Sequence, residues 1–292
     1  MASESPSSAA RSAENSESDI EPIRIGVLAV NSAVSAHNRY APLVDYLSQK
    51  LDRPFELLPA TQVSQFDAVK EEKVDFIINN PLAAVQIQRL YRTELLVTHF
   101  RPLSGAQFSG LIIVRSDSDI QGMDDLHGKQ VACVNFQAGA GGCLFQMYYL
   151  RQNDIDPFQD FGTFREIPSQ DNIVLSVLNG TIDAGFIRTG QLEKMQESNI
   201  LQNPNDIRVL KPVADEFFFE HTTRLYPEWP ISAMPGTDPD LRAQMKTALL
   251  QLEKNHSALA AANVESFVEA VDYQPMHALI ETLKLRSWDA AQ

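Results

Sequence analysis

Three side chains that could bind a ligand lie at two points where a predicted strand runs into a polar loop. Arg188 and Thr189 follow one such strand, and Asn80 precedes Pro81 after another. Arginine at a strand end can bind an oxyanion through two N–H groups at once. We therefore expect Arg188 and Thr189 to contact a small anion, with a salt bridge to a protein carboxylate as the alternative. Asn80 either contacts the same ligand or only caps the helix that begins at Pro81.

A glycine-rich stretch, QAGAGG at 137–142, follows another predicted strand and precedes a helix. Backbone N–H groups at Gly141 and Gly142, together with the positive end of the helix, favour an anion. Gln137 heads this loop, and Gln170 begins a nearby helix as a ligand-facing side chain or a cap. The alternative for the loop is a tight turn that needs positive φ. The spacing is not GxGxxG, which disfavours a dinucleotide.

Two similar units carry these residues. FDAVKEEKVDFIINNP (66–81) and QDNIVLSVLNGTIDAGFIRTG (170–190) each contain an apolar helix, a turn, an aspartate, an apolar strand and a polar loop. Open α/β sheets bind ligands at the carboxyl ends of their strands. Two such units about a hundred residues apart therefore predict two lobes that present polar loops to a shared cleft. Asn31, in the loop after the first strand (23–30), is expected to contact the ligand from the first lobe.

Strands alternate with helices along most of the chain, which predicts an α/β protein with mostly parallel sheets. We place the first lobe at 22–114 plus 216–292 and the second at 115–215. Residues 1–21 are rich in serine and glutamate, lack a signal-peptide core and cannot bury enough apolar surface to order themselves. The tail 273–285 is expected to pack onto the first lobe.

The length of the chain and its net charge limit the classes of function that it can have. The 292 residues suit two domains, and the formal net charge of −14 argues against nucleic acid and anionic membranes as partners. No run of apolar residues is long enough to suggest a transmembrane helix. A local arginine can still bind a small anion, so the acidic average does not exclude an anionic ligand.

Cysteine and histidine usage points away from metal and cofactor chemistry. Cys133 and Cys143 are expected to be buried apolar residues without a disulfide, with a reactive thiol at Cys143 as the alternative. The six histidines lack metal-ligand spacing, and we expect no metal, cofactor or catalytic residue. HTTRLYPEWP (221–230) is predicted to form a rigid surface loop near the hinge, where packing is favoured over ligand contact; His221 belongs to this segment.

Several segments together resemble a known family. IRIGVLAV, FDAVKEEKVDFIINNP, DDLHGKQVACVN and LNGTIDAGFIRTGQLE resemble the phosphate/phosphonate-binding family of type 2 periplasmic binding proteins over nearly all of 22–288. DAGFIRTGQLEKM and TTRLYPEWPISAMP are more specifically similar to periplasmic sensor domains of histidine kinases, such as the tetrathionate sensor. The resemblance implies a bilobal type 2 fold with a hinge, an interlobe cleft and a periplasmic location. The serine-rich phosphonate loop of the transporters is replaced here by 137–142, which removes its hydroxyl donors.

These observations predict a sensor domain that closes on a small, anionic solute and signals to a histidine kinase on the same full-length chain. A substrate-binding protein for a phosphonate- or phosphite-type ABC permease is the alternative. An enzyme of the porphobilinogen- or precursor-synthesis type is a third, and it would need Cys143 in the cleft. The expected ligand contacts are Asn31 and Asn80 from the first lobe, and Gln137, Gly141, Gly142, Gln170, Arg188 and Thr189 from the second.

Overall fold

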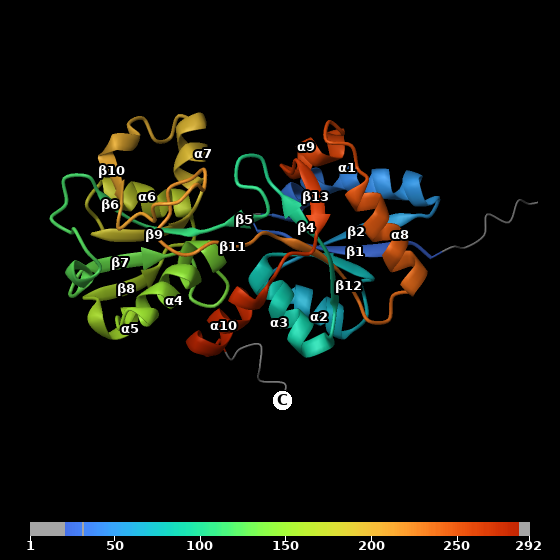
Figure 1. The fold of residues 1–292 in the computed structure, drawn as a ribbon, viewed down its shortest axis with the longest axis horizontal. Helices are drawn as coiled ribbons and strands as arrows, with labels where there is room; N and C mark the ends of the chain where they lie inside the picture. Colours follow the sequence, from blue (N-terminus) through green and yellow to red (C-terminus); the bar gives the residue numbers. More distant parts are fainter. Residues whose placement is uncertain (1–20, 31, 286–292) are drawn as a thin grey trace, which may run out of the picture.

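Two α/β lobes lie side by side and are joined by a narrow ribbon (Figure 1). The computed structural model describes residues 21–30 and 32–285. Within these residues the first lobe is built on a six-stranded sheet of order β13-β4-β12-β3-β1-β2, and the second on a five-stranded sheet of order β10-β6-β9-β7-β8. Helices cover both sheets.

The first lobe contains the amino-terminal and carboxy-terminal parts of the described chain. Its strands are β1 (Ile23–Leu28), β2 (Phe55–Ala60), β3 (Phe76–Ile78), β4 (Glu94–Phe100), β12 (Pro230–Ala233) and β13 (Ser266–Glu269). Its helices are α1 (Ala33–Leu51), α2 (Ser64–Lys70), α3 (Pro81–Tyr91), α8 (Pro239–Leu250), α9 (Ser257–Ala262) and α10 (Gln274–Leu283).

The second lobe contains the middle of the chain. Its strands are β6 (Gly110–Arg115), β7 (Gln130–Cys133), β8 (Thr163–Glu166), β9 (Ala184–Arg188) and β10 (Ile207–Val209). Its α-helices are α4 (Phe145–Gln152), α5 (Pro157–Asp160), α6 (Gln170–Leu178) and α7 (Gln191–Glu197), with short 3-10 helices at Asp124–Leu126 and Pro204–Asp206 and a π-helical turn at Ala140–Leu144.

Each sheet is mixed, which corrects the expectation of mostly parallel sheets. Parallel pairs join β1 to β2 and β3 in the first lobe, and β7 to β8 and β9 in the second. Antiparallel pairs form where the chain changes lobe. β12 returns from the second lobe between β3 and β4, and β6 enters the second lobe beside β9. The expected boundary after residue 114 falls inside β6, so the chain crosses into the second sheet earlier than the sequence indicated.

The two similar units use the same local device. Asp75, just before β3, accepts a hydrogen bond from the backbone N–H of Arg24 at 2.8 Å and donates its own N–H to the Arg24 carbonyl. Asp183, just before β9, does the same with Gln130, with an N–H to carboxylate distance of 2.7 Å. In both lobes the aspartate therefore ties the start of its strand to the neighbouring strand. This fixes the register of the strand that carries the polar loop.

The ribbon between the lobes consists of β5 (Gln107–Phe108) and β11 (Tyr226–Pro227), paired antiparallel. Threonine side chains join the two chain segments that continue from this ribbon into the second lobe by hydrogen bonds. The hydroxyl of Thr223 accepts from the N–H of Gly110, and that of Thr222 accepts from the N–H of Ile112, each at 3.0 Å. Both threonines are buried, as is Tyr226. Packing in the 221–230 segment is thus as expected, but the segment is a buried hinge and not a surface loop.

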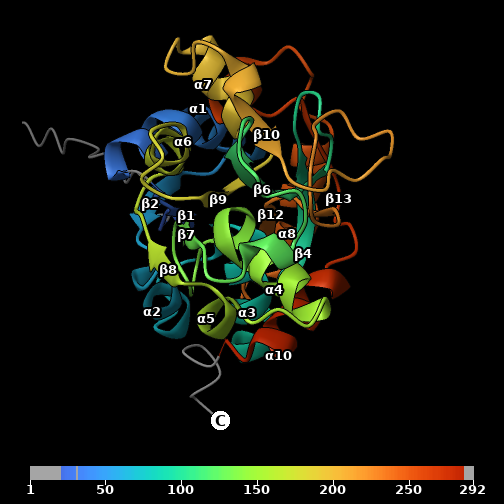
Figure 2. The same ribbon diagram turned by 90° about the vertical axis from the view of Figure 1, so that its left-hand side faces the viewer.

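The last described helix, α10, contacts both lobes. It packs against α3 of the first lobe and α4 of the second, and Met276, Leu279 and Ile280 belong to the same apolar cluster as Phe145. Figure 2, in which the second lobe faces the viewer, shows α10 below α4 and beside α3. The expectation that the tail packs onto the first lobe alone is therefore wrong. Its apolar face is wide enough to cover both surfaces, which the sequence pattern could not reveal.

One buried glutamine holds three parts of the second lobe together. The Nε2 of Gln146 on α4 donates to the carbonyls of Leu111, Gly141 and Ile187 at 2.8 to 3.1 Å. These carbonyls lie on β6, on the glycine-rich loop and on β9. A Cβ on Gly110 would lie 2.5 Å from this amide nitrogen, so the absence of a side chain at Gly110 leaves space for the amide.

We predict that Gln146→Met lowers the free energy of unfolding by about 1–3 kcal/mol, because it leaves buried carbonyls without a donor at almost constant side-chain volume. Urea unfolding followed by circular dichroism measures this. Gln152→Met, an exposed position on the same helix, is the control and should change stability little. Equal stability of the two variants would contradict the role assigned to Gln146.

Candidate functional site

Arg188 reaches the space between the lobes from the end of β9. Its backbone N–H donates to Oε1 of Gln170 at 2.7 Å, which fixes the strand end to the start of α6. Its guanidinium lies over the ring of Phe108 in the hinge, 5.4 Å from the ring centroid. Its side chain remains 40% exposed. The strand end is held firmly while the guanidinium still meets solvent.

Two further arginines approach from the first lobe. Arg39 lies on α1, and Arg101 directly follows β4. Both donate to the carbonyl of Ala262 at 2.9 to 3.0 Å, and Arg101 also donates to the carbonyl of Asn263 at 2.8 Å. These carbonyls lie at the carboxyl end of α9, where the helix dipole favours positive charge. The end of α9 therefore holds both guanidiniums in place.

Glu228 lies between the arginines of the two lobes. Its Oε2 is 3.4 Å from Nε of Arg101, and its Oε1 is 3.7 Å from a terminal nitrogen of Arg188. The side chain is only 1% exposed. Its backbone carbonyl accepts from the hydroxyl of Tyr273 at 2.7 Å, and its N–H donates to the carbonyl of Ala106 at 2.8 Å. The hinge thus fixes this carboxylate in position.

The three arginines affect one another electrostatically. Burial, together with the nearby Arg101 and Arg39, lowers the pKa of Arg188, while Glu228 opposes this. Burial also lowers the pKa of Arg39. Burial works against the charge of Arg101 too, but Glu228 and Tyr40 outweigh it, so the pKa of Arg101 is raised. Guanidiniums keep their protons in proteins, so three positive charges face one negative charge. An anion entering this space would relieve the repulsion.

His99 supports the first-lobe half of this cluster as a neutral side chain. Its Nδ1 lies 2.6 Å from the carbonyl oxygen of Trp229, which can only accept, so Nδ1 carries the proton. Nε2 is then the acceptor for the hydroxyl of Tyr40 at 3.4 Å. Burial and the positive charge of Arg101 hold the pKa of His99 well below its usual value of 6.5. The histidine is structural, as expected, and it orients Tyr40 beneath the arginines.

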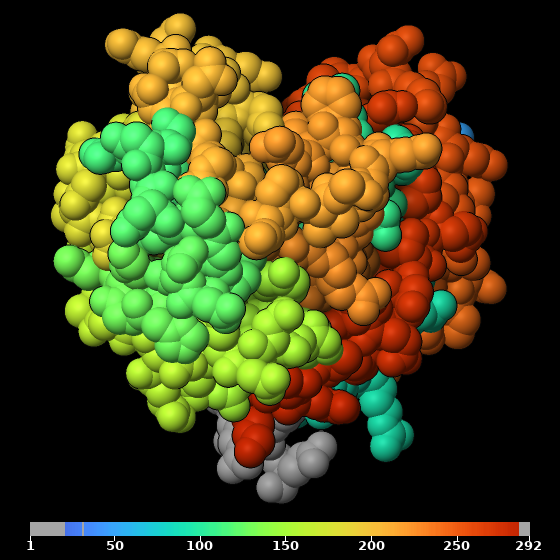
Figure 3. Space-filling view, turned by 60° about the vertical axis from the view of Figure 1, so that its left-hand side comes forward, coloured from blue at the N-terminus to red at the C-terminus, as the bar shows by residue number. Residues whose placement is uncertain are grey.

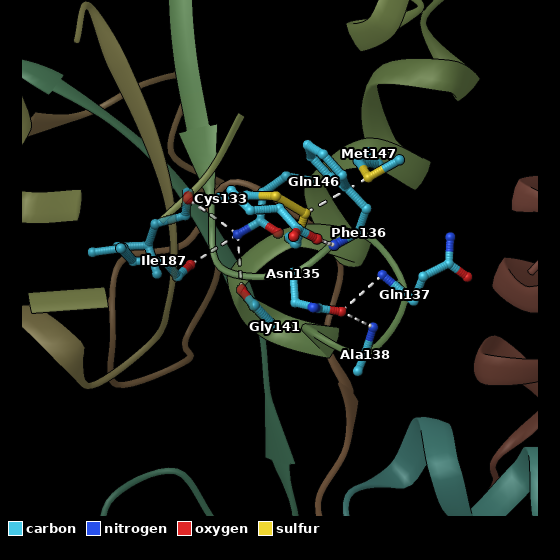
Figure 4. Close-up of a disulfide and its surroundings, with 12 residues drawn as sticks. Cys133, Asn135, Phe136, Gln137, Ala138, Gly141, Gln146, Met147 and Ile187 are labelled. Carbon is cyan, nitrogen blue, oxygen red and sulfur yellow. Dashed lines mark hydrogen bonds between the residues drawn. A yellow bond between two sulfur atoms is a disulfide. The ribbon is translucent and has the colours of Figure 1, made fainter. Parts of the chain in front are cut away.

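The glycine-rich loop lies against the second-lobe half of the cluster. A Cβ on Gly141 would lie 2.7 Å from the ring of Phe108 and 3.1 Å from Cβ of Arg188, and a Cβ on Gly142 would lie 3.2 Å from Cδ of Gln170. The glycines thus permit the start of a helix to approach Arg188. Figure 4 shows the loop, where Oδ1 of Asn135 accepts from the N–H groups of two residues that follow it.

The loop is closed by a disulfide between Cys133 and Cys143, whose Cα atoms are 5.0 Å apart (Figure 4). Both residues are fully buried, as expected, but the expectation of two unpaired cysteines is wrong. Strand β7 ends at Cys133 and the π-helical turn contains Cys143, so the fold brings together two residues that are ten apart. Cys143 has no thiol in this state, which removes the one nucleophile that the enzyme alternative required.

The structure brings four of the predicted residues together and separates others. Gly141, Gly142, Gln170 and Arg188 lie around the end of β9. Thr189 is buried, and its hydroxyl accepts from the N–H of Ser109 at 3.1 Å, so it joins β9 to the hinge.

The remaining predicted residues lie outside the arginine cluster or outside the described chain. Asn80 caps α3 by accepting from the N–H of Ala83 at 2.9 Å, which is the capping alternative; whether it also contacts a ligand stays a prediction. Gln137 is exposed, and Figure 4 shows its side chain directed away from the loop. Asn31 lies outside the described residues.

Sequence reasoning missed Arg39, Arg101 and Glu228. No strand was predicted over 94–100, so Arg101 was not recognised as a strand-end arginine like Arg188. Arg39 begins a stretch of helical apolar spacing, and nothing in that spacing marks it as a residue of a binding site. Glu228 lies in a segment that was assigned to packing. The one signal in the sequence was an acidic residue between two prolines.

The cluster opens to solvent between the lobes. The space-filling view shows a notch at the upper edge, between the second-lobe segment around α7 and the first-lobe segment around α9 (Figure 3). Arg188 lies just before α7, and Arg39 and Arg101 bind the end of α9, so the cluster is attached to the elements that border this notch. A separate open pocket of about 440 Å³ lies beside the hinge ribbon, lined in part by Phe100 and Arg224.

A comparison with known protein families decides the classification. Residues 25–274 match the family described as ABC transporter, phosphonate, periplasmic substrate-binding protein. The chain belongs to this family. The match covers most of both lobes, and it confirms the family resemblance and a solute-binding type of fold. No described helix is both long and apolar enough to cross a membrane. No described residues form a cluster of histidine, cysteine, aspartate or glutamate suited to a metal ion.

Among individual relatives, the tetrathionate sensor histidine kinase TtrS of Salmonella typhimurium is 26% identical over 275 residues. The match covers 90% of this chain and 46% of that protein. The chain thus spans about half the length of this curated relative. This supports the resemblance to sensor domains that the sequence indicated.

Solved structures share the fold. XAC2383 from Xanthomonas citri, bound to ATP, has a TM-score of 0.72 and 20% identity, and the match covers 92% of this chain and 98% of that one. PhnD1 from Prochlorococcus marinus, in complex with methylphosphonate, has a TM-score of 0.68 and 16% identity, covering 91% and 100% of the two chains. These likenesses confirm the bilobal α/β fold of type 2 periplasmic binding proteins.

We predict that replacing Cys133 and Cys143 by alanine lowers the free energy of unfolding by about 2–3 kcal/mol, because the disulfide restricts a short loop in the unfolded chain. Chemical unfolding with and without dithiothreitol measures the loss. The reductant should destabilise the wild type and leave the double variant unchanged. Two titratable thiols in wild type that was unfolded without reductant would show that the disulfide is absent.

We predict that His99 makes the protein less stable as the pH falls below about 6.5. In the unfolded chain His99 binds a proton near its usual pKa of 6.5, whereas the folded state keeps it neutral. The contribution is complete above pH 6.5 and is lost as the pH falls toward the lower folded-state pKa, by up to about 1.4 kcal/mol per pH unit. Unfolding free energies between pH 5 and 8 should show a shallower slope in His99→Gln. The exposed His37→Gln should keep the wild-type slope, and a His99→Gln slope equal to it would contradict this role.

Proposed function

We propose that this chain is an extracytoplasmic sensor domain that captures a small oxyanion between its lobes and signals by hinge closure. One observation carries the proposal: Arg101 of the first lobe and Arg188 of the second lie on either side of the same buried carboxylate, and Arg39 shares the carbonyl of Ala262 with Arg101. Arginine pairs well with the planar edges and tetrahedral oxygens of oxyanions. An anion that contacts both sets of arginines binds the closed form better than the open form, and this difference shifts the population toward closure.

The hinge and helix α10 can transmit the closure of the lobes away from the cleft. The ribbon β5–β11 carries Phe108 under Arg188, and Glu228 directly follows β11, so the ligand site and the hinge share residues. Helix α10 contacts α3 of one lobe and α4 of the other. A rotation of the lobes must therefore slide α10 against at least one of them. In the proposed sensor, this movement is relayed to a histidine kinase module on the same full-length chain.

The relative named as a tetrathionate sensor supports a sulfur oxyanion as the ligand and a kinase as the output. The alternative is a transport protein that delivers its solute to an ABC permease, which the family description and the methylphosphonate complex of a structural neighbour favour. Loss of the transporters' serine hydroxyls in 137–142 weighs against a phosphonate. Both functions use the same closure of the two lobes on a ligand, and they differ in the partner that detects this closure.

We predict that Arg188→Ala weakens binding of the anionic ligand by about 10- to 100-fold, because charge-assisted hydrogen bonds to a guanidinium contribute about 1.5–3 kcal/mol. A thermal-shift screen with tetrathionate, thiosulfate, sulfate, phosphite and methylphosphonate tests this. At least one anion should raise the melting temperature of the wild type and fail to raise that of the variant. Arg165→Ala, an exposed arginine of the second lobe, is the control and should keep the wild-type response. Equal shifts in wild type and Arg188→Ala would exclude Arg188 from the site.

A further inference from the structure

The arginine cluster contains one acidic side chain, and it belongs to the hinge. Glu228 lies between β11 and β12, on the segment that returns from the second lobe to the first. Within the described residues, the charged groups that shift the pKa of Arg188 are Glu228, Arg101 and Arg39. The cluster therefore carries three positive charges and one negative charge, an excess of two. A ligand that binds here must match this balance of charge.

We propose that Glu228 sets the charge of the ligand, so that the cleft selects dianions over monoanions of the same shape. This inference rests on the proposed function, because it assumes that the arginine cluster binds the solute. By cancelling one of three guanidinium charges, the carboxylate leaves two for the ligand to neutralise. Glu228 is then a specificity-determining residue that acts without contacting the ligand.

The geometry shows that Glu228 acts through its charge and leaves the arginine donors available. Its two oxygens are shared between the lobes, with Oε2 toward Arg101 and Oε1 toward Arg188. Both separations, 3.4 and 3.7 Å, are longer than a short paired hydrogen bond, and Oε1 has no hydrogen-bond partner. The guanidinium of Arg188 is therefore not clamped by the carboxylate. It can turn its N–H groups toward a ligand while it still feels the neighbouring negative charge.

Burial makes this single charge effective. Glu228 is almost fully buried, and its Oε2 accepts from the N–H of Trp229 at 3.1 Å, so the carboxylate cannot swing into solvent to escape an approaching anion. Charges in such a site are screened much less than charges at the surface. A monoanion leaves one guanidinium uncompensated, whereas a dianion neutralises the cluster. The arrangement thus distinguishes ligands by charge even when their oxygen geometry is the same.

The test uses pairs of anions that share a head group and differ by one charge. Sulfate is paired with methanesulfonate, and 1,2-ethanedisulfonate with ethanesulfonate. Isothermal titration at constant ionic strength gives the affinity ratio of dianion to monoanion for each pair. We expect a ratio of about tenfold or more in the wild type. Glu228→Gln raises the excess to three charges, so the ratio should rise further, because a dianion gains twice as much as a monoanion.

A second variant changes the charge balance without altering Glu228. Arg39→Gln lowers the excess to one, and the ratio should fall toward unity even if Glu228→Gln does not fold. Glu265→Gln removes a surface ion pair with Lys254 and is the control, with an unchanged ratio. A merely structural role for Glu228 would weaken both members of a pair equally.

The inference is overturned if matched anions bind the wild type equally, if none of the four probes binds, or if the ratio is the same in wild type, Glu228→Gln and Arg39→Gln. The Arg188→Ala screen decides the proposed function separately, since it requires only that one anion of any charge binds. A positive screen together with equal affinities for matched anions would keep the oxyanion sensor and remove the charge assignment.

Discussion

Repulsion among three guanidinium groups is the constraint that organises the space between the lobes. Arg39 and Arg101 are held by carbonyls at the end of α9, and Arg188 by its stacking on Phe108. The buried carboxylate of Glu228 lies between Arg101 and Arg188. The protein tolerates this because helix-end carbonyls and Glu228 offset part of the positive charge. What is left uncompensated is available to a ligand. In the proposed function, an anion between the lobes offsets the remaining positive charge.

The fold places each part of this arrangement at an edge or a joint. The two similar units position polar loops in the same way, through Asp75 in one lobe and Asp183 in the other, each tied to the backbone of the next strand. The end of β9 then carries Arg188 to the space between the lobes, and the end of β3 leads to Asn80, which caps α3. The hinge supplies Phe108 and Glu228. In the proposed sensor, the hinge contributes residues to the ligand site, which couples binding to movement of the lobes.

The glycine-rich loop of the second lobe is fixed in position although glycines restrict the backbone little. Glycines at 141 and 142 have no side chain to obstruct the approach to Arg188, but they also impose little conformation of their own. The disulfide at the two ends of this loop and the three carbonyls bound by Gln146 supply the missing restraint. An oxidising compartment would preserve the disulfide, in keeping with the periplasmic family to which the chain belongs.

Local patterns in the chain were sufficient for the two-lobed α/β architecture, the family and the strand-end position of Arg188. Each depends on residues close together in sequence: an apolar strand, a turn and a polar loop. The partners of Arg188 were not predictable in this way. Arg39 and Arg101 are 62 residues apart, and Glu228 lies 127 residues beyond Arg101. Glu228 reaches the cluster because β12 returns between β3 and β4. The disulfide, the mixed sheets and the double contact of α10 have the same origin. The spacing of residue types along the chain determines the conformation of a segment. The electrostatic field at a site instead depends on all the charged groups that the tertiary fold brings close together.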